Sequence, residues 1–312
     1  MTVATGDATA GMVPQAGSAR GGADRSANLG AYRVAERRER WLLQSLVLPG
    51  LALIGLIALA PIGWLFWMSV QGSSGFTLDH YQRLLDESYL RTLKTTFELS
   101  ILVTVLSIAL GYPLAYLISQ ARPRLAALLM LLVLFPVWTS LLVRCYAWLV
   151  LLQRRGVVNS WLQDMGIIDA PLKLMHNFTG TTIGMLHIML PFMILPLYAS
   201  MRSIDRDYMR AAANLGASPV RAFWQVFVPL SLPGLFAGII IVFVLCLGFY
   251  VTPALLGGGR VYMWSMQIER NVTYYADWGA ASALGVVLLA LTLGILWAVG
   301  RLIGFDRIVG GK

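Results

Sequence analysis

Six long apolar runs dominate this chain and restrict what it can fold into. They cover approximately residues 43–70, 96–119, 125–152, 181–200, 234–256 and 280–303. A helix that crosses a bilayer needs about 20 predominantly apolar residues, so each run is long enough to span a membrane. The sequence therefore predicts an all-α membrane protein with six transmembrane helices.

The composition agrees with a membrane protein and argues against a soluble one. Hydrophobic residues make up 58% of the chain, charged residues only 12%, and the mean hydropathy is +0.70, whereas a soluble domain carries about 25% charged residues. Cys145 and Cys246 both lie inside apolar runs, so we expect small core residues rather than disulfides or metal ligands. The net charge of +9 comes mostly from arginines beside the runs, which favours topology signals over nucleic-acid binding.

The distribution of basic residues predicts the orientation. With a cytoplasmic N-terminus, the inner segments hold fifteen Lys and Arg and the outer loops hold eight, and basic residues prefer the cytoplasmic side. We therefore expect an N-in, C-in bundle in residues 41–312. Residues 1–40 are rich in Gly, Ala and Ser, end in a basic run and contain no apolar signal-peptide core, so we expect a disordered cytoplasmic tail.

The inner segment 201–233 is a polar loop with helix-breaking residues. Its first part, YMRAAANL, is rich in Ala, which favours a helix. Asp205 or Asp207 is placed to cap this helix at its N-terminus, and Gly216 suits the left-handed residue that ends a helix.

A second short helix is expected after Gly216. Ser218 and Pro219 are typical of a cap followed by a first-turn proline, and Pro229 with Pro233 is expected to end this helix before the next span. The loop would then be two short helices lying along the membrane.

The spacing in this loop resembles the motif of permease subunits of ABC importers: Glu-Ala-Ala, three residues, Gly, nine residues, Ile-x-Leu-Pro. The matching places are occupied by Ala211, Ala212, Gly216, Val226, Val228 and Pro229. The resemblance implies that the loop is a coupling helix, which inserts into a cleft of a cytoplasmic ATPase and transmits its opening and closing.

Arg210 departs from the motif because it stands where the family has Glu. A cation near a helix N-terminus is unfavourable by about 0.3–1 kcal/mol. We therefore expect either a contact carried by shape and backbone or a matching acid on the ATPase.

Three further segments resemble the polyamine (spermidine/putrescine-type) importers, most closely the first of their two permease subunits. These are FPVWTSLLVRCYAWLVLLQRRGVVN (135–159), LPFMILPLYASM (190–201) and LGFYVTPALLGGG (247–259). The resemblance runs from about residue 75 to 303. It implies the type I importer permease fold in a bacterial inner membrane, with a second permease, an ATPase dimer and an extracytoplasmic binding protein as partners.

Candidates for a translocation path come from polar and aromatic residues in the runs. Aromatic faces suit a dehydrated ammonium group through cation–π contacts, although aromatic residues also fill cores and interfacial belts. Arg144 is the strongly charged residue well inside a run, so it is either a gate residue or the partner of Glu98. The candidates are Trp138, Arg144, Tyr146, Tyr198, Tyr250 and Thr252.

Two other features complete the expectations for the outer half. Pro253, just after Tyr250, suggests a broken helix, and His187 in the fourth run is expected to be a hydrogen-bonded packing residue. The outer loop 257–279 carries Glu269 and Asp277 among several aromatic residues. It is a candidate for receiving the substrate or docking the binding protein.

Several motifs of other protein classes are missing from the sequence. No P-loop occurs, since no lysine precedes Ser and only Lys94 precedes Thr, without the required glycines. No catalytic triad or metal cluster is evident, so we expect a transport subunit without cofactor or metal, and hydrolysis by a partner. Two alternatives stay open: a permease of the same architecture for sulfate, iron or a sugar derivative, or a stand-alone secondary transporter.

Overall fold

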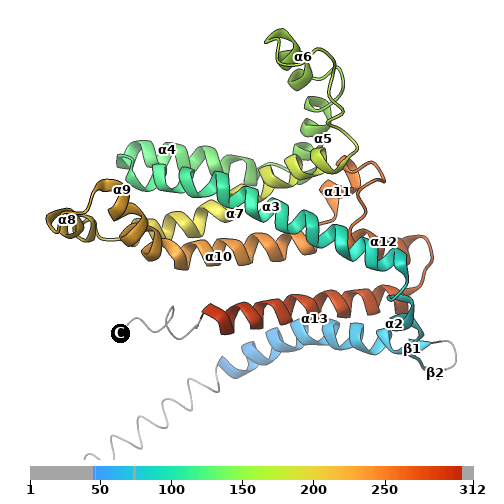
Figure 1. Cartoon of the computed structure of the whole chain (residues 1–312). Helices are drawn as coiled ribbons and strands as arrows, with labels where there is room; N and C mark the ends of the chain where they lie inside the picture. Colours follow the sequence, from blue (N-terminus) through green and yellow to red (C-terminus); the bar gives the residue numbers. More distant parts are fainter. Residues whose placement is uncertain (1–44, 46, 73–74, 304–312) are drawn as a thin grey trace, which may run out of the picture. The chain divides into compact units, whose positions relative to one another are not determined.

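Helices make up most of the described chain in the computed structural model, which describes residues 45, 47–72 and 75–303 (Figure 1). The predicted tail, residues 1–40, lies outside the described residues. The chain separates into two compact units, residues 1–63 and residues 64–312. The described part of the first unit belongs to the helix Val47–Ser69, which continues into the second unit. This helix is apolar all round and exposes large side chains such as Leu48 and Leu59, as expected for a helix surrounded by lipid.

The second unit contains a short hairpin and a series of helices. Its strands are β1 (Gln71–Gly72) and β2 (Gly75–Phe76), which pair in antiparallel register. Its helical elements are α2 (Asp79–Arg83), α3 (Glu87–Gln120), α4 (Pro123–Leu134), η1 (Phe135–Trp138), α5 (Leu141–Leu151), α6 (Val157–Asp164), α7 (Phe178–Ser203), α8 (Arg206–Asn214), α9 (Pro219–Ala222), η2 (Phe223–Phe227), α10 (Val228–Leu247), α11 (Val251–Leu256), α12 (Trp264–Thr273) and α13 (Trp278–Ile303).

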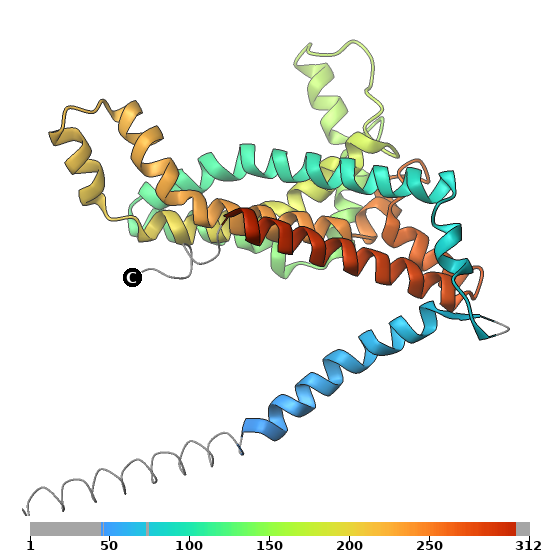
Figure 2. The ribbon, with the colours of Figure 1, turned by 60° about the horizontal axis from the view of Figure 1, so that its bottom comes forward.

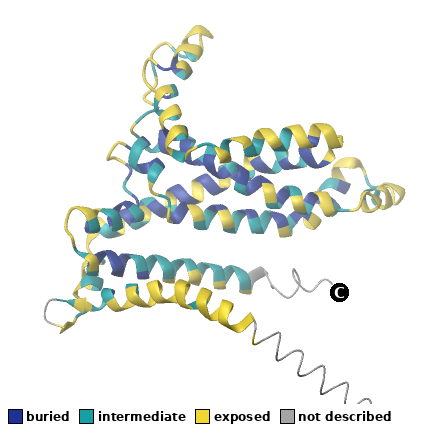
Figure 3. Ribbon diagram, turned by 180° about the vertical axis from the view of Figure 1, so that it is seen from behind, coloured by how far each residue is buried: buried dark blue, intermediate teal, exposed yellow. Residues whose placement is uncertain are grey.

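The core of this unit is a bundle of α3, α7 and α10, which lie side by side (Figure 1). Their facing sides are buried, whereas the outer sides of the same helices are exposed (Figure 3). The bundle is filled by aliphatic and methionine side chains with little or no exposed surface, including Leu99, Val103, Met189, Met193 and Leu197. Methionine suits such a position because its unbranched side chain fills irregular gaps.

Glycines allow the helices of the bundle to approach closely. A Cβ atom on Gly234 of α10 would lie 2.6 Å from the backbone oxygen of Pro196 on α7. A Cβ atom on Gly238 would lie 2.7 Å from the Sδ atom of Met193. Small residues at helix contacts are the usual means of packing transmembrane helices, so these two positions set the distance between α7 and α10.

The end of the bundle near α12 is held by a hydroxyl-rich face of α3. Thr96 is fully buried, and its Oγ1 accepts a hydrogen bond of 2.8 Å from the backbone N–H of Trp264. The indole Nε1 of Trp264 donates to the backbone oxygen of Leu284 on α13 at 3.0 Å. Trp264 therefore joins α3 to α13 at the first residue of α12.

The described helices support five continuous spans and one bent pair, which together make six if the pair counts as one span. The third run, 125–152, is broken: Pro123–Trp138 and Leu141–Leu151 are inclined at 98° to each other. The 3₁₀ turn η1 carries Pro136 and ends where Thr139 and Ser140 adopt extended backbone. A proline in a tightened turn followed by extended residues interrupts the helical hydrogen bonds.

The fifth run is also interrupted, in this case as the sequence suggested. Helix α10 ends at Leu247, and α11 begins at Val251 with Tyr250 at its N-cap position. Pro253 lies in the first turn of α11, where a proline removes no helical hydrogen bond.

Candidate functional site

The loop between α7 and α10 folds into the helix pair α8 and α9, which extends beyond one end of the α3–α7–α10 bundle (Figure 2). Asp205 caps α8, since its Oδ1 accepts a hydrogen bond of 3.0 Å from the N–H of Asp207. Gly216 has a positive φ of 82° and follows the end of α8. Ser218 caps α9 by accepting from the N–H of Arg221 at 3.4 Å, and Pro219 is the first residue of α9. These features confirm the predicted helix boundaries at Asp205, Gly216 and Ser218.

The predicted end of the second helix at Pro229 is wrong. The helix continues without interruption from Pro219 to Leu247 and contains both Pro229 and Pro233. A π-helical turn, η2, immediately precedes Pro229. A widened turn leaves room for a proline ring that would otherwise meet the carbonyl of the preceding turn. The second half of the loop is thus a direct extension of α10 rather than a separate helix along the membrane.

The helix pair presents apolar and small side chains to the surroundings. Leu215 is 89% exposed and Trp224 is 64% exposed, and Tyr208 and Val220 are also exposed. Between α8 and α9 lies an open hollow of about 290 Å³, whose lining comprises Ala212, Leu215, Gly216, Ala217, Arg221, Ala222, Gln225 and Val226. Exposed apolar groups beside a hollow are typical of a surface that a partner protein covers.

Arg210, the residue that departs from the family motif, has a partner on its own helix. Its Nη1 lies 3.0 Å from Oδ1 of Asp207. Both side chains are about three-quarters exposed, 76% and 74%. The charge of Arg210 is therefore balanced within α8, which the sequence analysis did not anticipate.

The predicted path residues fall at different places. Thr252 is fully buried in α11, and its hydroxyl lies 3.3 Å from the Sγ of Cys145 on α5. Tyr250 precedes α11 at the break and is partly exposed, whereas Trp138 and Tyr146 are exposed on η1 and α5. Tyr198 lies near the opposite end of α7. The structure thus brings Thr252 to α5 but separates Tyr198 from the other candidates.

Arg144 does not pair with Glu98 in the described residues. Glu98 instead lies 3.7 Å from Lys94, one turn away on α3. The Nε of Arg144 is buried without a hydrogen-bond partner, and so is the Nδ1 of His187 on α7. The centre of the His187 ring lies 5.6 Å from that of Trp148 on α5, in an edge-on arrangement. His187 is therefore a packing residue, and its Nδ1 takes no part in the hydrogen bonding that the sequence led us to expect.

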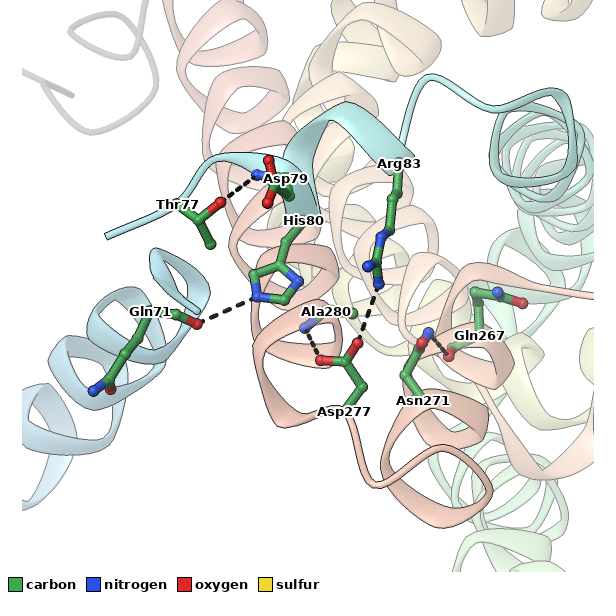
Figure 4. A network of polar contacts seen from close by, with 9 residues as sticks. All are labelled: Gln71, Thr77, Asp79, His80, Arg83, Gln267, Asn271, Asp277 and Ala280. Atoms are coloured by element: carbon green, nitrogen blue, oxygen red, sulfur yellow. Dashed lines mark hydrogen bonds and ion pairs between the residues drawn. The ribbon is translucent and has the colours of Figure 1, made fainter. Parts of the chain in front are cut away.

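Asp277, a candidate for the outer docking loop, is held by a network near α12 (Figure 4). Its Oδ2 lies 3.4 Å from Nη1 of Arg83, and its Oδ1 accepts from the N–H of Ala280 at 2.9 Å. In the same network, Nε2 of His80 lies 3.3 Å from the backbone oxygen of Gln71. Asp277 therefore joins α2 to the start of α13, and its contacts give it a structural role.

The segment 257–279 also contains an aromatic ring that lies against a cation of the chain itself. The guanidinium of Arg270 lies 5.5 Å from the centre of the Tyr275 ring. This guanidinium is charged at physiological pH, and hydrogen bonding to Tyr262 raises the pKa of Arg270 further. The ring of Tyr275 is thus occupied by a residue of the chain itself.

Comparisons with known proteins agree with this fold. Residues 107–303 match the family model described as "binding-protein-dependent transport system inner membrane component". The spermidine/putrescine transport system permease protein PotB of Salmonella typhimurium is 33% identical over 84% of this chain and 91% of that protein. PotB of Escherichia coli is 32% identical over 84% of this chain and 95% of that protein.

A solved structure gives the same fold. A bacterial ABC transporter involved in the import of the polysaccharide alginate has a TM-score of 0.67 with 19% sequence identity, and the match covers 90% of this chain and 100% of that chain. The likeness confirms the expected importer-permease fold. The family match confirms the expectations of a transport component and an inner-membrane location, and it decides against a stand-alone secondary transporter. From its helical core and its sequence alike, the chain belongs to the family of binding-protein-dependent transport system inner membrane components.

Proposed function

We propose that this chain is the permease subunit that moves polyamines such as spermidine and putrescine through the inner membrane. It would act with a second permease, an ATPase dimer and a soluble binding protein. The observation that carries the proposal is the α8–α9 loop, which matches the importer coupling motif and exposes apolar side chains at one end of the bundle. The cargo is supported by the identity of 33% with a spermidine/putrescine permease.

The proposed orientation places α8 and α9 in the cytoplasm and α12 outside. It is supported by the larger number of basic residues in the segments that the sequence assigns to the inner side, among them the loop 201–233. In this orientation the ATPase meets the exposed residues of α8 and α9, and the binding protein meets the loops around α6 and α12.

We assign the contact with the ATPase to the helix pair α8–α9. Ala211 and Ala212 allow close approach of a partner's groove because their side chains are small, and Gly216 permits the sharp turn between the helices. Val226 lines the hollow of about 290 Å³ between them. Pro229 follows the π-turn and lies inside the helix that leads into the membrane. Arg210 contributes to this surface as half of an ion pair with Asp207.

We assign the path to the region where α5 and α7 meet α11, beside the interruption of the fifth run. Tyr250, Trp138 and Tyr146 present aromatic faces that suit an ammonium group without a fixed negative charge. Arg144 repels a polycation, so its role is that of a gate or scaffold. Thr252 and Tyr198 are weaker candidates, because the first is fully buried against Cys145 and the second lies toward the other end of α7.

The test is reconstitution of the full assembly in liposomes. The chain is co-expressed with candidate ATPase, second-permease and binding-protein subunits, and uptake of labelled spermidine and putrescine is measured with ATP inside the liposomes. We expect uptake that requires both ATP and the binding protein. A matched preparation with an ATPase variant that does not hydrolyse ATP is the control.

This design tests the identity of the cargo and the importer role separately. Labelled sulfate, iron and a sugar derivative are offered to the same liposomes. ATP-dependent uptake of one of these without uptake of polyamines would reject the cargo and keep the importer role. Uptake of spermidine without the binding protein or ATP would reject the importer role itself.

A further inference from the structure

Four aromatic side chains connect η2, at the base of the coupling loop (residues 201–233), to helix α3 of the bundle. Tyr116 of α3 packs edge-on against Phe223 and Phe227 of η2, with ring centres 5.2 and 5.0 Å away. Phe223 and Phe227 stack on each other at 5.8 Å with only 13° between their planes. Trp224 packs edge-on against Phe223 at 5.5 Å. These four residues form a continuous aromatic set.

The two ends of the aromatic set lie in different surroundings. Trp224 is 64% exposed in η2, directly after α9, whereas Phe227 is only 3% exposed and belongs to the buried core. The set therefore leads from an exposed position next to the proposed contact helices to the interior of the bundle. The only other aromatic pair that the described residues place between α3 and α10 is Phe97 with Phe243, whose ring centres are 6.1 Å apart.

Helix α8 is attached less directly to α3. An open hollow of about 380 Å³ separates the two, and its lining comprises Tyr116, Gln120, Ile204, Asp205, Arg206, Met209, Arg210 and Phe227. The main contacts of α8 are with α9 and η2. A force on α8 can therefore reach the bundle along the chain, through the two-residue link to α7, and by packing, through η2. The packing route passes through a π-helical turn, and π-turns occur frequently at functional sites.

We propose that Tyr116 is the positioning residue through which movement of the coupling loop reaches α3, by its contacts with Phe223 and Phe227. The inference rests on the proposed function and names the route inside the permease. Because protein interiors are close-packed, rigid rings in contact transmit a displacement, whereas the hollow beside α8 absorbs one. Since α3 packs on both α7 and α10, a shift of α3 reaches the whole bundle.

The test uses three variants of the complete assembly in liposomes. Tyr116→Leu removes the ring, Tyr116→Phe keeps the ring and loses only the hydroxyl, and Phe97→Leu removes a ring from α3 at the other aromatic contact. Uptake of labelled spermidine and putrescine and ATP hydrolysis are measured on the same liposomes. We expect Tyr116→Leu to keep basal ATP hydrolysis and to lower uptake per ATP at least about fivefold. Tyr116→Phe and Phe97→Leu should stay within about twofold of the unchanged chain.

Several outcomes would overturn the inference. One is a normal ratio of uptake to hydrolysis in Tyr116→Leu, and another is a Tyr116→Phe variant as defective as Tyr116→Leu. If Tyr116→Leu does not assemble, Phe223→Leu removes the other ring of the same contact at a half-buried position. The same decrease in uptake per ATP is expected for this variant. Loss of assembly in both variants would assign the rings a structural role and reject the proposal.

Uptake by the unchanged chain distinguishes failure of the inference from failure of the proposed function. ATP-dependent uptake by the unchanged chain that survives in Tyr116→Leu rejects the inference alone. Absence of uptake of every labelled cargo by the unchanged chain rejects the proposed function and the inference together.

Discussion

At the scale of single residues, the ion-pair or hydrogen-bond partner of a polar side chain determines which further groups it can bind. Arg210 lies 3.0 Å from Asp207, so its charge is balanced on α8 before any ATPase is bound. Thr252 is fully buried, and its hydroxyl faces Cys145 at 3.3 Å. Both contacts lead to predictions that differ from those drawn from residue type alone.

The first prediction concerns Arg210. An exposed ion pair one turn apart on a helix contributes about 0.2–0.5 kcal/mol, so Arg210→Gln should change the Tm of the permease by less than about 2 °C. Transport should fall less than about threefold, because Arg210 is paired on its own helix and needs no acid on the ATPase. Arg210→Glu is the comparison, since it places two acids one turn apart. A loss of ATPase stimulation above about tenfold in Arg210→Gln would instead indicate a specific acid on the ATPase.

The second prediction concerns Thr252. Thr252→Val keeps the shape and removes the hydroxyl, which should lower stability by about 0.5–1.5 kcal/mol for the lost hydrogen bond. The KM for spermidine uptake should not change, because the hydroxyl is directed to Cys145. The double variant Thr252→Val with Cys145→Ala should lose less stability than the sum of the two single variants, since both changes remove the same contact. A threefold or larger rise in KM would show that Thr252 contacts the cargo.

At the scale of elements, close approach of α7 and α10 depends on positions without a side chain. A Cβ atom added at Gly234 would meet the backbone oxygen of Pro196 and the Cβ atom of Ser200. Neither atom can move away without a shift of the α7 backbone. At Gly238 the nearest atom is the Sδ of Met193, which can move. Gly294 of α13 has open space around its Cα.

The third prediction compares alanine at these three glycines. Gly234→Ala should destabilise the permease by about 1–3 kcal/mol, the usual effect of overpacking, and Gly238→Ala should be milder. Gly294→Ala should be neutral or stabilising, because Ala favours a helix over Gly by about 1 kcal/mol. Thermal unfolding of the purified permease in detergent gives the ranking. Equal effects at Gly234 and Gly294 would contradict the close contact between α7 and α10.

At the scale of the whole molecule, the proposed orientation rests on the charge distribution, and it assigns each partner to one surface. The two native cysteines, Cys145 and Cys246, are buried, so an introduced cysteine can be followed on an otherwise unchanged chain. Leu215 of the coupling loop and Met165, just after α6, are both strongly exposed, and they lie on opposite sides in the proposed topology.

The fourth prediction concerns this topology. In intact spheroplasts that lack the ATPase, a membrane-impermeant thiol reagent should label Met165→Cys but not Leu215→Cys. After permeabilisation both should react. The unchanged chain is the control and should stay unlabelled. Labelling of Leu215→Cys from outside would reverse the proposed orientation and remove the basis for ATPase docking.

Much of the fold and of the coupling loop follows from local patterns. The apolar runs predict the helices because the bilayer demands a minimum length. Asp205, Gly216 and Ser218 predict the boundaries of α8 and α9 because capping and a positive φ depend on neighbouring residues only. The contact of Arg83 with Asp277 could not be predicted in this way, because 194 residues separate the two side chains.

The prediction that the second helix ends at Pro229 is wrong because of contacts between distant parts of the chain. A proline usually ends a helix, but here the preceding π-turn accommodates the proline ring, and Phe223 and Phe227 of that turn pack on Tyr116 of α3. The packing of this turn is a tertiary contact, and it outweighs the local preference of the proline. The bend after Trp138 similarly depends on extended backbone at Thr139 and Ser140 within an otherwise apolar run.

The sequence by itself determined that this chain is a membrane protein and which family it resembles, and it predicted a coupling loop. Each of these depends on composition, run length or short spacing. Only the tertiary structure decided that α9 continues into α10, that Asp207 balances Arg210, and that aromatic rings join η2 to α3. These depend on which side chains meet in space, and close packing of distant segments can override the preference of any single residue.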